Sequence, residues 1–167
     1  MFGRSRRPTT GNRQYEPSTL IGTFLLNAVF DRRELRKKYQ LELSERVPLG
    51  GFEQAQVATV VLRSFMRRFF AGLPTEENID IFIDGLYRDV PVDLIQYRNE
   101  STAVVKSTVE GLNELVVGVS KSHAVEIRMT IIGMMVRRLN ISEAEVCKAI
   151  VAAERELIAQ GVPLLAL

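Results

Sequence analysis

The stretch MMVRRLNISEAEVCKAIVAAERELI, residues 134–158, predicts two helices that meet at a short corner. Ser142 can cap the second helix, and Glu145, three residues later, can complete a reciprocal capping box. Ile141 precedes the cap and can pack onto Val146. The apolar residues that follow have helical spacing: Val146, Ala149, Ile150, Ala153 and Leu157. We therefore expect a helix after Ser142 and a helical architecture around it.

Helical patterns continue outward from this corner. Apolar residues recur at helical spacing in a segment that starts at Ser18, at 52–71, after Thr75, from Ser101 to about Gly118, and from Ser122 to Leu139. The sequence AGLP, residues 71–74, predicts a helix end with Gly72 as the left-handed residue. Residues 39–43 fit a short extended piece, and the β-branched residues of 100–120 fit a hairpin. The expected fold is all-α, a compact bundle of about five to seven helices, with an α+β fold as the alternative.

Composition and charge limit the class of protein. The chain has 167 residues, 46% hydrophobic and 25% charged, which is typical of a globular protein with a real core. The net charge of +2 does not by itself indicate a nucleic-acid binder. Cys147 is the single cysteine, so an intramolecular disulfide is excluded. We find neither an apolar signal-peptide core nor a run long enough to span a membrane, and we expect a soluble, cytoplasmic protein.

Two basic clusters are candidate contacts for a polyanion. Residues 1–16 form an expected flexible basic arm, and residues 17–167 form an expected single helical domain. The cationic residues are Arg4, Arg6, Arg7 and Arg13 in the arm, and Arg32, Arg33, Arg36, Lys37 and Lys38 after the first helix. They could bind nucleic acid, an anionic lipid surface or an acidic protein. The alternative is a solubilising tail and a solvated helix face.

A methionine-rich helix and the C-terminal tail are candidate contact surfaces. Residues 127–136, IRMTIIGMMV, are apolar on most sides, as in a helix that is central in a core or covered by another subunit. The tail VPLLAL, residues 162–167, must dock on its own core or on a neighbour. The predicted partner-binding residues are Met129, Ile132, Met134, Met135, Leu164, Leu165 and Leu167.

The sequence offers no recognisable catalytic pattern. His123 is the single histidine, which excludes a multi-histidine metal site. Cys147 has no histidine nearby in the sequence to activate it. Asp80 and Asp84 lie one helical turn apart, but nothing supplies further metal ligands. Phosphate-binding and dinucleotide-binding glycine motifs are also missing. We expect no enzyme activity, no cofactor and no metal.

The corner also resembles the turn and second helix of bacterial helix-turn-helix proteins. The positions that carry this resemblance are Leu139, Asn140, Ile141, Ser142, Val146 and Ile150. It implies a DNA-binding regulator over residues 128–158, with Arg137, Arg138 and Lys148 on the DNA backbone. The sequence departs from the pattern at Val136, where a small residue is usual, and at Glu143, which would face phosphates.

A contact protein explains these features best. We expect an adaptor, an assembly subunit or a regulator that self-associates, or docks another protein, through the apolar helix and the C-terminal tail. DNA reading through the corner is the alternative.

Overall fold

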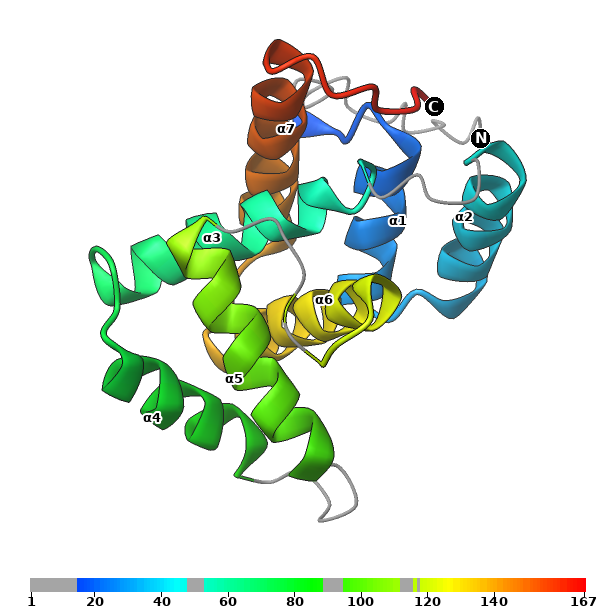
Figure 1. Ribbon diagram of the computed structural model, residues 1–167. Helices are drawn as coiled ribbons and strands as arrows, with labels where there is room; N and C mark the ends of the chain where they lie inside the picture. The colour runs from blue at the N-terminus through cyan, green and yellow to red at the C-terminus, as the bar shows by residue number, and fades with distance from the viewer. Residues whose placement is uncertain (1–14, 48–52, 89–94, 112–115, 117) are drawn as a thin grey trace, which may run out of the picture.

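The computed structural model describes residues 15–47, 53–88, 95–111, 116 and 118–167. The chain forms seven helices there: α1 (Leu20–Val29), α2 (Arg33–Arg46), α3 (Gln56–Phe70), α4 (Glu76–Tyr87), α5 (Ile95–Glu110), α6 (Lys121–Arg138) and α7 (Glu143–Ala159) (Figure 1). This part of the chain has no strand beyond an isolated bridge between Thr19 and Ala166. The all-α prediction is confirmed.

Helix α6 lies at the centre of the bundle. It packs against α1, α3, α4 and α5. Its buried residues lie around most of its circumference: Ala124, Ile127, Arg128, Ile131, Ile132, Gly133, Met135 and Val136. A Cβ at Gly133 would lie at an ordinary contact distance of 3.8 Å from the carbonyl oxygen of Val29, so α1 ends against this part of α6. The chain's own core therefore covers most of the helix that the sequence shows to be apolar all round.

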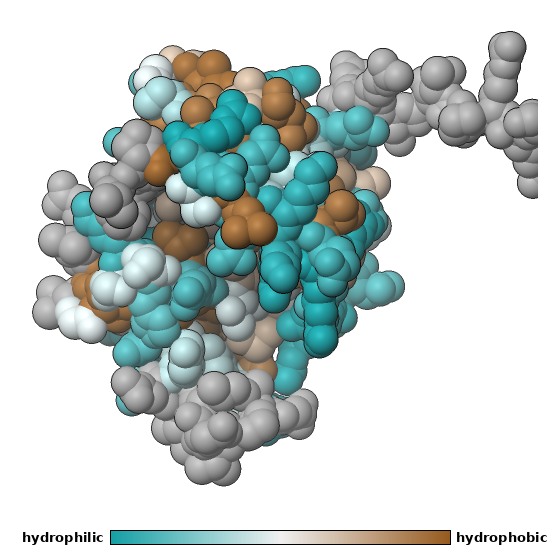
Figure 2. All heavy atoms as spheres, turned by 90° about the vertical axis from the view of Figure 1, so that its right-hand side faces the viewer, coloured by the Kyte–Doolittle hydropathy of each residue, from teal (hydrophilic) through white to brown (hydrophobic). Residues whose placement is uncertain are grey.

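Different helices form the two opposite sides of the bundle. Helices α4 and α5 pack together at one end, and α2 packs beside α1 on the opposite side (Figure 1). Helix α2 buries no residue completely. The view from the α2 side shows hydrophilic side chains over much of that face, with hydrophobic side chains between them (Figure 2). None of the helices in the described ranges is both long and apolar enough to cross a membrane.

The N-terminus of α1 is fixed by a buried carboxylate from α7. Glu154, 1% exposed, accepts hydrogen bonds from the backbone N–H and hydroxyl groups of both Ser18 and Thr19, at 2.7–3.1 Å. A carboxylate is favourable there because backbone N–H groups at a helix N-terminus carry partial positive charge. A Cβ at Gly22 would lie 2.1 Å from Glu154 Oε1, so only glycine allows this approach.

The C-terminal tail docks on its own chain. The Leu20 N–H donates to the Leu165 carbonyl at 2.9 Å, and the Leu167 N–H donates to the Ser18 carbonyl at 3.2 Å. Gln54 holds the tail from the other side, because its amide donates to the Pro163 carbonyl and accepts from the Leu165 N–H. The tail therefore closes the bundle beside α1.

Most helix boundaries differ from the predicted ones by a few residues. Thr19 caps α1 where Ser18 was expected, and Ser120 caps α6. Ala71, with φ 52°, is the left-handed residue after α3, one position before the expected Gly72. The predicted extended piece at 39–43 is wrong, since those residues lie within α2.

The region 100–120 shows the largest difference from the expected boundaries. Helix α5 begins at Ile95, six residues before the expected Ser101, and continues to Glu110. Ser101 is buried within it and shares a 2.7 Å hydrogen bond with the Tyr87 hydroxyl. The predicted hairpin is wrong over 100–110, and the turn at 112–115 lies outside the described residues.

Candidate functional site

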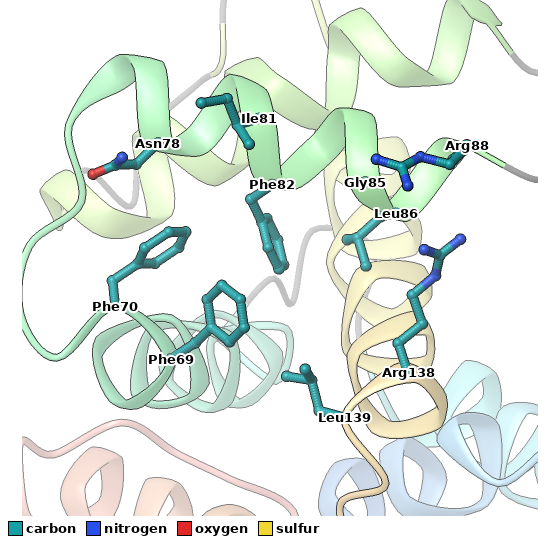
Figure 3. A pocket seen from close by; sticks show the side chains of 10 residues that line it. All are labelled: Phe69, Phe70, Asn78, Ile81, Phe82, Gly85, Leu86, Arg88, Arg138 and Leu139. Atoms are coloured by element: carbon teal, nitrogen blue, oxygen red, sulfur yellow. The ribbon is translucent and has the colours of Figure 1, made fainter.

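An apolar groove of about 360 Å³ opens between α3, α4 and the C-terminal end of α6 (Figure 3). The lining residues come from these three elements and their ends: Phe69, Phe70, Asn78, Ile81, Phe82, Gly85, Leu86, Arg88, Arg138 and Leu139. A second hollow shares Phe69 and Leu139 and continues toward the corner between α6 and α7. We call the first hollow the aromatic groove.

Local sequence signals bring the two main walls of the aromatic groove together. Helix α3 ends with Phe69 and Phe70, and Ala71 turns the chain because its φ is 52°. Thr75 then caps α4 in a reciprocal capping box with Asn78, so that α4 returns across the end of α3. The ring centroid of Phe82 on α4 lies 5.2 Å from that of Phe69 and 5.7 Å from that of Phe70. Such edge and tilted arrangements are favourable for aromatic pairs.

Large apolar side chains around the aromatic groove remain exposed. Ile81 is 62% exposed, Phe69 44% and Leu139 42%. Arg88 and Arg138 both line the groove, on the side where Leu86 lies in the view of Figure 3. The groove thus combines an aromatic floor, an open apolar rim and positive charge on one side.

The predicted partner-binding residues divide into three groups. Ile132 and Met135 are completely buried in the core, and the prediction for these two is wrong because neighbouring helices surround α6. Met129, Met134 and Leu164 are partly buried and pack against the core. Leu165 is partly buried in the docked tail, while Leu167 is 60% exposed at its end.

The corner between α6 and α7 has the predicted local geometry. Ser142 and Glu145 form the capping box, and Asn140 adopts the left-handed conformation with φ 50°. Both helices are fully described, and they do not pack along each other; α7 packs on α3 and α1 instead. Glu145 binds Arg68 of α3 at 2.8 Å. Contacts with α3 and α1 therefore position α7 after the corner. Sequence-specific DNA binding through this corner stays a prediction.

The cationic residues that were predicted to contact DNA or a polyanion lie in different surroundings. Arg137 and Arg138 are exposed at the end of α6, and the Lys148 ammonium lies 5.2 Å from the ring centroid of Tyr15. Arg32 binds Glu143 at 2.5 Å, and Arg33 lies 3.9 Å from Asp31. The remaining residues of that set divide in two: Arg36, Lys37 and Lys38 are exposed on α2, and Arg4, Arg6, Arg7 and Arg13 lie outside the described residues.

A polar cluster joins α4, α5 and α6. His123 Nε2 lies 2.7 Å from a Glu100 carboxylate oxygen, and this contact raises the pKa of His123 above its usual value. Ser101, next to Glu100 on α5, bonds the Tyr87 hydroxyl, whose pKa is raised chiefly by burial. These contacts tie neighbouring helices together.

The structure places the remaining chemically reactive groups apart. Burial, followed by the charge of Glu143, raises the pKa of Cys147, which disfavours its nucleophilic thiolate form. Within the described ranges, no three His, Cys, Asp or Glu residues lie close enough together to hold a metal ion. Asp84, one of the paired carboxylates, binds Arg98 of α5.

The aromatic groove could not be predicted from apolar periodicity. Phe69 and Phe70 continue the apolar stripe of α3, a pattern typical of core residues, whereas Phe69 is exposed at the helix end. One signal was available: Ile81 lies outside the stripe of Ile79, Phe82, Ile83 and Leu86, the four residues that α4 buries. Comparisons with protein-family models, curated proteins and solved structures give no match.

Proposed function

We propose that the chain is a non-catalytic assembly protein that binds a protein partner through the aromatic groove. The observation that carries this proposal is the convergence of three large exposed apolar side chains, Phe69, Ile81 and Leu139, around one hollow. Scattered exposed apolar residues are ordinary, whereas a contiguous apolar patch with a polar rim is typical of interaction sites.

The composition of the groove supports a protein partner. Aromatic and arginine side chains are enriched among the residues that contribute most to protein–protein binding. The groove offers three phenylalanines and two arginines, Arg88 and Arg138. A partner with an apolar helix face and a nearby carboxylate would fit this pattern.

This contact surface differs from the one predicted from the sequence. Helix α6 contributes only its C-terminal end to the aromatic groove, because its methionine-rich middle packs in the core. The C-terminal tail is hydrogen-bonded to Ser18, Leu20 and Gln54 of its own chain. The proposed partner therefore meets α3 and α4 at the opposite end of the molecule from the tail (Figure 1).

Site-specific photo-crosslinking tests the proposal. A benzophenone amino acid is placed at Ile81 in one variant and at Ile158 in another, and both are irradiated in the cells that naturally make the protein. Ile158 is a matched control because it is 53% exposed, on α7, outside the aromatic groove. We expect one defined adduct at position 81, identified by mass spectrometry as this chain or one other protein.

The control at position 158 tests whether cross-linking is specific to the aromatic groove. Equal adducts at positions 81 and 158, or no protein adduct at position 81, would contradict the proposed function. Circular dichroism of both purified variants checks that the helical fold is retained.

A further inference from the structure

Three residues of α4 and its C-cap residue form a continuous stripe along the open side of the aromatic groove. Asn78, Ile81, Gly85 and Arg88 all line the groove, at spacings of three, four and three residues. This is the spacing of the seam positions in a coiled coil. Asn78, Ile81 and Arg88 are exposed, and Gly85 is partly exposed. The stripe therefore lies on one helix face, with Ile81 as its apolar residue, and the chain itself leaves this face uncovered.

We infer that a second copy of this chain occupies the groove, with its α4 packed antiparallel to the first about a two-fold axis. The inference rests on the proposed function and names its partner. In such a pair, Ile81 of each copy lies opposite Gly85 of the other, and Asn78 lies opposite Arg88. A two-fold interface requires this reciprocity, because the same patch must be complementary to itself.

Two charged residues in or beside the stripe, Glu77 and Arg88, select the antiparallel direction, since Glu76 and Asp84 already pair with Lys106 and Arg98 of the same chain. Glu77 lies in the first turn and Arg88 just after the last, about 16 Å apart along the helix axis at 1.5 Å per residue. Neither side chain forms an ion pair within the part of the chain that the structure describes. An antiparallel pair brings Glu77 of each copy near Arg88 of the other. A parallel pair would set like charges together.

Gly85 supplies an independent argument. Glycine destabilises the interior of a helix relative to alanine, so its presence within α4 requires a reason. A Cβ built at Gly85 meets nothing within 4 Å, so packing inside the chain does not require glycine there. Close approach of a second helix would explain the glycine, since the missing side chain leaves room for Ile81 of the other copy.

The size of the stripe predicts a weak complex. Three helical turns with flanking contacts from Phe69 and Leu139 make a small interface, and stable complexes bury about 800 Å² on each partner. We expect a reversible dimer with a dissociation constant of roughly 10–100 µM, a range that sedimentation velocity covers when the protein concentration is varied.

A charge-swap experiment tests the orientation. Glu77→Arg and Arg88→Glu are each expected to weaken the dimer about tenfold, because each replaces two attractive contacts by two repulsive ones. The double variant, and an equimolar mixture of the two single variants, are expected to recover wild-type association. Both positions are exposed, and thermal unfolding of each variant checks that the monomer is intact.

Disulfide cross-linking provides a second readout. In a Cys147→Ser background, a mixture of the Asn78→Cys and Arg88→Cys variants is expected to form the mixed disulfide, and each variant alone is expected to form little. A monomeric wild type at about 1 mM, singles that associate like wild type, or preferential self-linking of one variant would overturn the inference. An adduct at position 81 with a different protein would leave the proposed function standing and overturn only this inference.

Discussion

Replacing Glu154 with glutamine perturbs the contact that fixes α1 to α7. One carboxylate oxygen accepts from the backbone N–H and the hydroxyl of Ser18, both at 3.0 Å. The other accepts from the same groups of Thr19, at 3.1 and 2.7 Å. Glutamine has nearly the same size as glutamate. It keeps one acceptor oxygen and turns the other into an amide donor.

The expected loss of stability follows from this change in hydrogen bonding. Hydrogen bonds to a charged group contribute about 1.5–3 kcal/mol each, and a negative charge at a helix N-terminus adds about 0.3–1 kcal/mol. The Ser18 hydroxyl can rotate to accept from the new amide, but the Ser18 N–H loses its acceptor. Because Ser18 is exposed, water replaces part of that bond. We expect the free energy of unfolding to fall by about 2 kcal/mol.

Urea unfolding followed by circular dichroism measures this loss. Glu156→Gln is the matched control, since Glu156 is exposed on the same helix and its change should stay within about 0.5 kcal/mol. The midpoint of Glu154→Gln should fall at an unchanged slope, which reports a change of stability without a change of compactness. If Glu154→Gln unfolds at the same urea concentration as the control, the carboxylate does not anchor α1, and the reasoning is refuted.

Two predictions concern protonation. Glu100 raises the pKa of His123 above its unfolded value near 6.5. Their contact therefore stabilises the fold below pH 6.5, and this contribution is lost as the pH rises through the folded pKa. NMR titration of the single histidine should give a lower pKa in Glu100→Gln than in the wild type. The Ser142 backbone N–H, then Arg68, lower the pKa of Glu145 to about 2. That contribution is present above pH about 4.5 and is lost as pH falls through about 2. Carboxyl NMR of Arg68→Ala should show a higher Glu145 pKa, and an unchanged value would contradict the assignment.

The helices that were predicted best are those whose ends carry their own signals. Ser142 with Glu145 and Thr75 with the acidic first turn of α4 define helix starts within four residues of sequence. Gly161, with φ 80°, follows α7 and precedes Val162 and Pro163, an order of residues that is typical of a helix end. Because these interactions are local, a single sequence contains all the information that they need.

Boundaries set by distant contacts could not be predicted in the same way. Serine is a common N-cap residue, but Ser101 lies inside α5 because this helix begins at Ile95. Its hydroxyl shares a hydrogen bond with the Tyr87 hydroxyl. Arg128 interrupts the apolar face of α6 yet is buried, since its Nε donates to the Thr108 hydroxyl at 3.1 Å. Burial lowers the pKa of Arg128. Such polar partners lie 14 and 20 residues apart in the sequence, and only the packed helices show which of them meet.

The aromatic groove illustrates why an interaction surface is harder to predict than a core. The sequence reveals that α6 carries more apolar surface than one helix face needs, but not that α1, α3, α4 and α5 surround it. The residues that remain for a partner are those that the core leaves uncovered, such as Ile81, and Gly85, which no packing within the chain requires. A residue that departs from the stripe of its own helix is therefore a better indicator of a contact surface than the most apolar helix, because the chain's own packing does not explain it.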